Sequence, residues 1–184
     1  MHHPSQRAQF ERTVLPHLDA AYNLARWLLR NDADADDVTQ EACVRAYRFF
    51  DSFHGGNAKT WLLTIVRHAC YTWLKQHRAE KSTMPFDEQQ HSSNSDDPAA
   101  GHTPFSASPE ALFLQAANRR LLQQCLEGLP LEFREAVVLR ELEGLSYKEI
   151  SVVLDVPIGT VMSRLARGRG LLQQQLAAHS GQES

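Results

Sequence analysis

The chain has 184 residues, enough for one ordinary domain or two small ones, and 42% of them are apolar, which suffices for packed cores. It has no apolar run near the length of about eighteen residues that crosses a membrane, and its first residues lack the apolar block of a signal peptide, so we expect a cytoplasmic protein. The three cysteines form no C-x-x-C pair and the nine histidines are scattered, so no disulfide framework, metal site or other cofactor is indicated.

The net charge of -3 conceals a segregation of charge along the chain. Residues 59–81 carry five Lys or Arg and one acid, whereas residues 82–114 carry five acids and no Lys or Arg. A chain that is acidic overall can therefore present a local basic surface that attracts phosphates.

The first 50 residues predict two amphipathic helices. Apolar residues recur at helical spacing over residues 10–30, with Pro16 as a kink in the first turn. The acidic run that follows predicts a second helix with Asp34 as its N-cap. We expect the second helix to bury Val38, Ala42, Ala46, Phe49 and Phe50.

Residues 54–57, HGGN, predict a tight loop, and a long helix is expected over residues 58–78. One face of this helix carries the apolar side chains of Leu62, Ile65, Val66, Ala69 and Trp73. The opposite face carries Thr60, Thr64, Arg67, His68, Tyr71, Lys75 and Arg78. Cations for phosphates beside aromatic rings for bases are typical of single-stranded DNA binding, although a solvated face with a half-packed tyrosine fits these residues equally well.

A change of composition separates this helix from the rest of the chain. Residues 81–108 are rich in Ser, Pro, Asp and Gly and lack periodicity, which predicts a flexible acidic linker. A helix is expected from Pro109 to Glu127 with Ser108 as its N-cap, ending at Gly128. A short helix should follow and stop at Gly144, with its inward side chains at Phe133, Val137, Val138, Leu139 and Leu142.

Residues 144–172 predict a helix-turn-helix. Ser146 and Glu149 have the S-x-x-E spacing of a capping box, and Asp155-Val156-Pro157 should end the first helix. From about Ile158, the second helix places one stripe toward the domain, made of Val161, Leu165, Gly168 and Leu172. The outward residues would be Thr160, Met162, Ser163, Ala166 and Arg167, a pattern that favours major-groove binding over a merely solvated basic face.

The predicted fold is therefore all-α, with two small helical domains joined by a flexible acidic linker, the second of them a helix-turn-helix domain. The expected boundaries are residues 1–80 for the first domain, 81–108 for the linker, 109–178 for the second domain and 179–184 for a frayed tail.

In this order, the parts resemble a bacterial RNA polymerase sigma factor of the sigma-70 family, extracytoplasmic-function type. Two blocks carry the resemblance: DADADDVTQEACVRAYRFFDSF with TWLLTIVRHACYTWLKQHR resembles the family's second conserved region, and LPLEFREAVVLRELEGLSYKEISVVLDVPIGTVMSRLARGRGLL resembles its fourth. The resemblance implies a non-enzymatic initiation factor that binds core RNA polymerase and promoter DNA and has an anti-sigma protein as a further partner.

The resemblance also implies roles for individual residues. The clamp helices of the largest polymerase subunit would bind Asp37, Gln40 and Glu41. The minus-10 element would be melted and read by Asn57, Lys59, Arg67, His68, Tyr71, Lys75 and Arg78. The minus-35 element would be bound in its major groove by Thr160, Met162, Ser163, Arg164, Ala166 and Arg167.

Several residues depart from the family pattern. His68 stands where asparagine is common, so we expect a different base preference, and Met162 and Ala166 leave less hydrogen-bond readout in the recognition helix. Gly168 and Gly170 stand where alanine is usual and cost about 1 kcal/mol each in a helix, so the end of that helix is expected to order fully only on DNA.

Three other functions compete with this interpretation. A stand-alone helix-turn-helix regulator would bind duplex DNA tightly without polymerase. A helical interaction protein with merely solvated basic faces would have no salt-dependent affinity for nucleic acid. A His/Cys metalloenzyme would need ligand spacings that the sequence does not contain.

Overall fold

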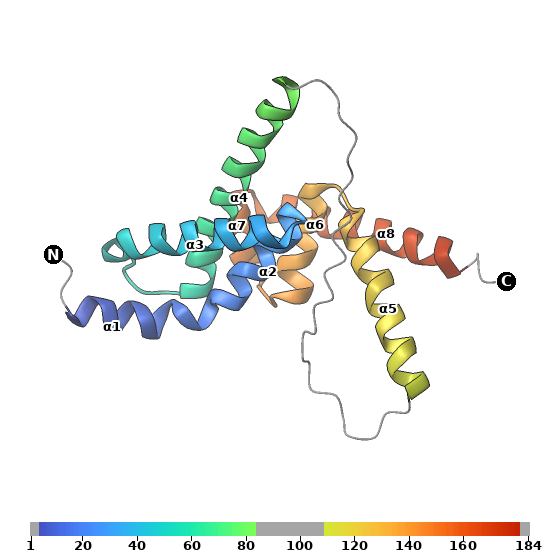
Figure 1. Cartoon of the computed structure of the whole chain (residues 1–184), viewed down its shortest axis with the longest axis horizontal. Coiled ribbons are helices and arrows are strands. Elements are labelled where there is room, and N and C mark those ends of the chain that lie inside the picture. The colour runs from blue at the N-terminus through green and yellow to red at the C-terminus, as the bar shows by residue number, and fades with distance from the viewer. Residues whose placement is uncertain (1–3, 84–108, 181–184) are drawn as a thin grey trace.

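The computed structural model describes residues 4–83 and 109–180, and every regular element in these ranges is helical. The N-terminal domain contains α1 (Pro4–Thr13), the 3-10 turn η1 (Leu15–His17), α2 (Leu18–Leu29), α3 (Asp32–Arg48), the 3-10 turn η2 (Phe50–Ser52) and α4 (Ala58–Thr83). The C-terminal domain contains α5 (Pro109–Glu127), α6 (Leu131–Val137), the π-helical turn η3 (Val138–Leu142), α7 (Tyr147–Leu154) and α8 (Ile158–Ser180) (Figure 1). The predicted all-α class with two helical domains is confirmed, whereas most of the expected linker and Ser108 lie outside the described residues.

The first predicted helix is two helices in the structure. Pro16 lies in the short 3-10 turn that separates α1 from α2, so it breaks the helix instead of kinking it. The left-handed conformation of Arg30, with φ of 60°, ends α2. The chain then enters α3 through Asn31, whose side chain accepts a hydrogen bond from the Asp34 amide. The N-cap is therefore Asn31, and the prediction of Asp34 was wrong by three residues.

The core of the N-terminal domain lies where α2, α3 and α4 pack together. Leu28 of α2 and Leu62 and Val66 of α4 are buried there, as the periodicity predicted, and Leu24 of α2 is fully buried as well. Phe50 is buried as expected, but Phe49, also expected in this core, is 59% exposed, because it lies just past the end of α3 where the 3-10 turn η2 begins.

The turn that closes the short helix α6 differs from its prediction. From Val138 to Leu142 the backbone is π-helical, and the Glu143 amide donates to the carbonyl of Val138, five residues back. The wider turn shifts the register, so Leu142, expected inward, is exposed. Gly144 then ends the segment with φ of 70°, as its position predicted.

The helix-turn-helix has the predicted local structure. Ser146 and Glu149 form the capping box of α7, and Asp155 ends this helix in the left-handed conformation. Val161 and Leu165 of α8 are buried against the domain. The expected loosening after Gly168 is not observed, since α8 continues to Ser180. A Cβ added at Gly168 would lie 2.7 Å from Cγ2 of Val137, so glycine here permits close packing of α8 on α6.

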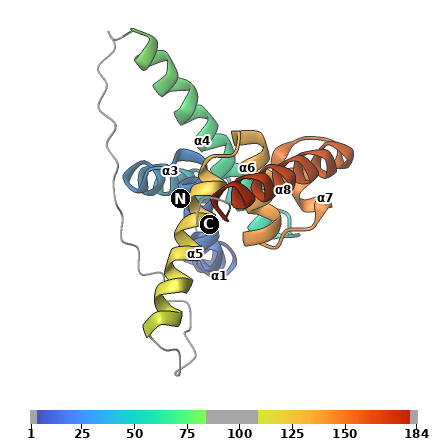
Figure 2. The same ribbon diagram turned by 90° about the vertical axis from the view of Figure 1, so that its right-hand side faces the viewer.

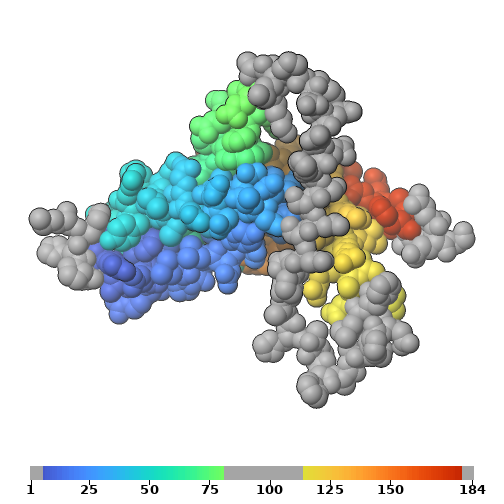
Figure 3. Space-filling model, viewed as in Figure 1, coloured from blue at the N-terminus to red at the C-terminus, as the bar shows by residue number. Residues whose placement is uncertain are grey.

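The two domains pack against each other. The contacts join α4 to α7 and α2 to α6. The start of α4, just after the HGGN loop, therefore lies against the helix-turn-helix. The C-terminal end of α4 and the N-terminal end of α5 project away from this common body in both ribbon views (Figure 2). The space-filling view shows α1, α2 and α3 as one continuous surface beneath the projecting end of α4 (Figure 3). No helix in the described ranges is long and apolar enough to cross a membrane.

Candidate nucleic-acid interface

The predicted site residues fall on three helix faces. The α3 face holds Asp37, Gln40 and Glu41. The α4 face holds Asn57, Lys59, Arg67, His68, Tyr71, Lys75 and Arg78, counting Asn57 just before the helix. The α8 face holds Thr160, Met162, Ser163, Arg164, Ala166 and Arg167.

The start of α4 is fixed by its own side chains. The Thr60 amide donates to Oδ1 of Asn57 at 3.0 Å, so Asn57 caps the helix. Phe50, Phe53 and Trp61 pack their rings beside the loop, with centroids 5.1 Å apart for Phe53 and Trp61. Phe53 and Trp61 have no predicted role, although aromatic residues flanking a glycine loop could have indicated that they support the loop.

The middle of the α4 face is covered by the C-terminal domain. The Arg67 guanidinium donates to both oxygens of Glu135, at 2.8 and 3.1 Å, and only 14% of its side chain is exposed. The guanidinium also lies 4.3 Å from the centre of the Tyr71 ring. We expected Thr60, Arg67 and Tyr71 on one exposed surface; Thr60 is in fact buried and the other two are half-buried, because helical periodicity does not show which domain packs on a polar face.

The covered residues have perturbed acid-base properties. Burial, to which the charge of Glu135 adds, raises the pKa of Tyr71 to about 12. Burial alone would lower the pKa of Arg67, but its hydrogen bonds and ion pair with Glu135 raise it above the ordinary value. Tyr71 is therefore a neutral phenol and Arg67 a cation under all ordinary conditions, which suits a stacking ring and a phosphate or base ligand.

The two ends of the α4 face differ. At its start, Nζ of Lys59 lies 2.7 Å from the carbonyl oxygen and 3.2 Å from a carboxylate oxygen of Glu143, both in the C-terminal domain. At its other end, His68, Lys75 and Arg78 are exposed. These three side chains line a shallow pocket together with Tyr71, Thr72, Leu74 and Leu131.

The α8 face is open over most of its length. Met162, Ser163, Ala166 and Arg167 are exposed, as predicted for residues that approach a groove. Arg164 is the exception, because its guanidinium reaches the carboxylates of Glu135 at 3.4 Å and Glu132 at 3.8 Å. The α3 face is open as well: Asp37, Gln40 and Glu41 are all exposed, and Glu41 forms an ion pair with Arg45 of the same helix at 2.8 Å.

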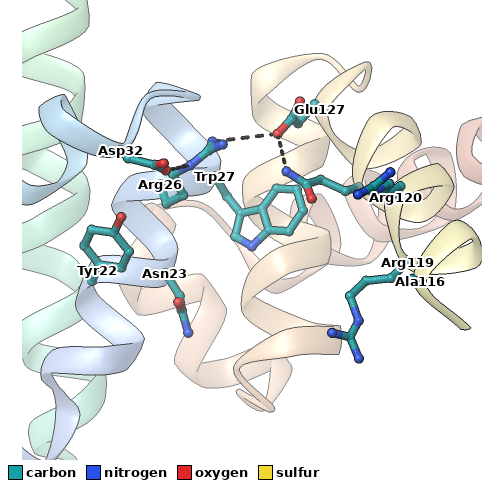
Figure 4. Close-up of a pocket in the computed structure, with 10 residues that line it drawn as sticks. Tyr22, Asn23, Arg26, Trp27, Asp32, Ala116, Arg119, Arg120 and Glu127 are labelled. Carbon is teal, nitrogen blue, oxygen red and sulfur yellow. Dashed lines mark hydrogen bonds and ion pairs between the residues drawn. The ribbon is translucent and has the colours of Figure 1, made fainter. Parts of the chain in front are cut away.

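Glu135 and Glu127 contribute to the contact between the two domains, and neither was predicted from the sequence. A third contact between the domains lies between α2 and α5, where Figure 4 shows Arg26 of α2 between Asp32 and Glu127. The Arg26 guanidinium lies 3.7 Å from Glu127 across the domain boundary, and Tyr22, Trp27, Arg119 and Arg120 line the pocket around this pair. No periodic pattern predicts such pairs, because each depends on how two distant segments dock.

Both halves of the chain match known protein families. The Sigma-70 region 2 family matches residues 13–80, and the Sigma-70, region 4 family matches residues 119–172. The ECF RNA polymerase sigma-E factor of Escherichia coli is 36% identical over 146 residues, covering 78% of this chain and 74% of the relative. The ECF RNA polymerase sigma factor SigE of Mycolicibacterium smegmatis is 35% identical over 174 residues, covering 94% of this chain; the chain spans 63% of that relative's length.

Two solved structures have a similar fold. The sigma factor RpoE from Bartonella quintana, in complex with the anti-sigma factor NepR, aligns with a TM-score of 0.69 and 26% identity, covering 92% of this chain and 97% of that one. CnrH, in complex with the cytosolic domain of CnrY, aligns with a TM-score of 0.63 and 23% identity, covering 94% and 90% of the two chains.

Proposed function

Because this chain belongs to the extracytoplasmic-function (ECF) family of RNA polymerase sigma factors, we propose that it binds core RNA polymerase and directs initiation at a specific set of promoters. Sigma factors are not enzymes, so the chemistry belongs to the polymerase and this chain supplies recognition. The observation that carries the proposal is the pair of polar faces on α4 and α8, each on the region that matches a sigma domain. RNA polymerase acts in the cytoplasm, and we assign this chain to the same compartment.

The α4 face is our proposed minus-10 surface. Lys59, Lys75 and Arg78 would bind phosphates, while the Tyr71 ring, with the Arg67 guanidinium 4.3 Å away, would stack on an unpaired base. Extruding a base costs a few kcal/mol of stacking and pairing, and contacts of this kind would offset that cost. Asn57 and His68 complete the surface, and His68 is where we expect the base preference to depart from that of relatives with asparagine.

The α8 face is our proposed minus-35 surface. Support comes from its exposure and from its place in the second helix of the helix-turn-helix, the helix that enters the major groove in this motif. Met162 and Ala166 offer apolar contacts to base edges, and Thr160 and Ser163 offer hydroxyls. Arg164 and Arg167 would reach phosphates or a guanine.

The α3 face is our proposed docking surface for the clamp helices of the largest polymerase subunit. Asp37, Gln40 and Glu41 are exposed side by side on one helix, where they can meet a basic partner. We also propose that an anti-sigma protein controls this chain, because the similar RpoE of Bartonella quintana was solved with the anti-sigma factor NepR.

The proposal is tested by run-off transcription with purified chain, core polymerase and a library of promoter-like duplexes. We expect specific transcripts that depend on the added chain and are lost or strongly reduced with Tyr71→Ala or Arg167→Ala. Arg12→Ala, on the exposed surface of α1, is the matched control for loss of a cation and should leave the transcripts unchanged. No transcript, together with tight binding of duplex DNA by the free chain, would favour a stand-alone regulator instead.

A further inference from the structure

We propose that the free chain is closed on itself: its C-terminal domain covers the centre and start of the α4 face, and three glutamates of that domain occupy positions where DNA would bind. The occupant of this surface is thus the chain's own segment from Glu135 to Glu149. The inference rests on the proposed function only in assigning the α4 face to DNA.

Glu135 is the principal contact. Its carboxylate is fully buried and accepts two hydrogen bonds from Arg67, a bidentate geometry that Arg also uses to bind a phosphate or a guanine. Leu131, four residues earlier on α6, lines the pocket next to Tyr71 and Lys75. Arg67 and Tyr71, the proposed centre of minus-10 recognition, therefore already have partners in the closed chain.

The other two glutamates act at the start of α4. Glu143 holds Lys59 through its carboxylate and its carbonyl oxygen, at 3.2 and 2.7 Å. Glu149 accepts a hydrogen bond from Nδ2 of Asn57 at 2.6 Å while it caps its own helix. The carboxylates that contact Asn57, Lys59 and Arg67 are negatively charged, like the phosphates of a DNA backbone. The carboxylates and the DNA cannot bind the same donors at the same time.

Glu135 also joins the two DNA-binding faces. The carboxylate oxygen that accepts from Arg67 at 3.1 Å lies 3.4 Å from the Arg164 guanidinium of the α8 face. One buried acid thus holds one cation from each proposed DNA surface. Separation of the domains would release Arg67 outright and leave Arg164 with Glu135 and Glu132 of its own domain.

The closed state also contains an unfavourable contact that makes it separable. Arg134, next to Glu135, is buried, and in the part of the chain that the structure describes its Nε has no hydrogen-bond partner. Burial, followed by the charge of Arg30 in the N-terminal domain, lowers the pKa of Arg134. Opening would hydrate this guanidinium and move it away from Arg30, which offsets part of the loss of the Arg67–Glu135 pair.

The faces that stay open indicate when the chain would open. The α3 face and most of the α8 face are exposed in the closed state. Polymerase can therefore bind the closed chain at the α3 face first, and separation of the domains along the polymerase would then expose the α4 face. The closed state would keep free chain from binding single-stranded nucleic acid elsewhere.

The experiment compares full-length wild type with two single variants, Glu135→Gln and Glu143→Gln. Glu141→Gln is the matched control, because Glu141 pairs with Arg169 inside the C-terminal domain. Small-angle X-ray scattering measures how extended each free chain is. Fluorescence anisotropy measures binding of a labelled single strand that carries the minus-10 sequence selected by run-off transcription, and circular dichroism confirms that each variant is folded.

We expect the wild type to be compact and to bind weakly, Glu135→Gln to be more extended and to bind about tenfold tighter, and Glu143→Gln to shift both in the same direction by less, because apparent affinity scales with the open fraction. Glu141→Gln should match wild type. A wild type that scatters as an extended chain would overturn the closed state, and unchanged compact scattering in both interface variants would overturn the role of the glutamates in holding it. Opening without tighter binding would overturn the masking of DNA and identify the minus-10 assignment as the failing premise. If Glu135→Gln does not fold, Glu143→Gln decides.

Discussion

The two surfaces proposed for DNA differ in what lies over them. The α4 face is held at Asn57, Lys59 and Arg67 by side chains of the other domain, whereas Met162, Ser163, Ala166 and Arg167 of the α8 face are open to solvent. Duplex DNA presents its groove without any change of its own, but the minus-10 element must be melted before a base can stack on Tyr71.

This difference fits the two forms of DNA that the two faces are proposed to bind. A surface for duplex DNA can be ready at all times, since its ligand is always present in that form. A surface of cations and an aromatic ring would bind many single strands with little sequence preference. Covering this surface until polymerase is present would prevent such non-specific binding. Four predictions test how strictly the two faces differ, beginning with the largest effect.

Thiol reactivity should report the covered side of α4. Burial, to which the charge of Glu135 adds, raises the pKa of Cys70 to about 12, so at pH 8 we expect alkylation of Cys70 to be at least about 100-fold slower than that of an ordinary cysteine thiol. Cys43 of α3, which is half-buried, should react first. Timed labelling followed by mass spectrometry of the peptides measures both rates. Equal rates for Cys43 and Cys70 would contradict a covered α4.

Duplex binding should test whether the α8 face is ready in the free chain. Arg167→Ala should cost about 1–3 kcal/mol of affinity for a minus-35 duplex if Arg167 reads a guanine, or lower the salt slope by about 1 if it binds a phosphate. Anisotropy at several salt concentrations, without polymerase, distinguishes the two. Arg12→Ala serves as the control on net charge, and an Arg167→Ala variant that binds with wild-type affinity and slope would show that the open face is not used.

A pair of glycine variants tests how the packed side of α8 is held. Gly168→Ala places a Cβ 2.7 Å from Val137, and overpacking of this kind should destabilise the chain by about 1–3 kcal/mol. Gly170→Ala meets no atom within 4 Å among the described residues and should stabilise the helix by about 0.5–1 kcal/mol. Urea unfolding of both variants gives the difference, and effects of the same sign would refute the close packing of α6 and α8.

The smallest expected effect concerns Glu149, which touches both domains. Its pKa is lowered by hydrogen bonds from Ser146, first from the backbone amide, and from Asn57. A lowered carboxyl pKa adds stability that is present at neutral pH and is lost as the pH falls through that lowered value. Glu149→Gln should therefore destabilise the chain by about 0.5–1 kcal/mol at pH 7 and by almost nothing at about pH 3. An equal difference at both pH values would show that ionised Glu149 is not what matters.

Local signals made most of this fold predictable. The capping box at Ser146 and Glu149, the stop at Asp155 and the glycine loop before α4 each depend on a few neighbouring residues, and the structure has all of them. The core stripes of α2, α4 and α8 follow from helical periodicity in the same way. The site residues were chosen by resemblance to a family, and the structure adds which of them are covered.

The failures share a physical cause. Phe49 and Leu142 lie where a 3-10 turn and a π turn change the register, and such turns leave no mark on hydrophobic spacing. Glu135 reads as an ordinary charged helix residue, yet it is fully buried because Arg67, 68 residues away, meets it there. Contacts between domains depend on docking, which a single sequence does not encode at any one position.

The closed state depends on the number of residues in the π turn from Val138 to Leu142. A π turn accommodates one residue more than an α turn, and here that residue sets where Glu143 meets Lys59. Deletion of one residue within this turn would restore α-helical geometry there. Because α8 packs closely on α6, the change of register would fall on the segment from Glu143 to Glu149. Every side chain proposed to contact DNA would be retained, but Glu143 and Glu149 would lose their contacts with Lys59 and Asn57. Relatives that lack one residue at this turn are therefore expected to have separated domains even in the absence of polymerase.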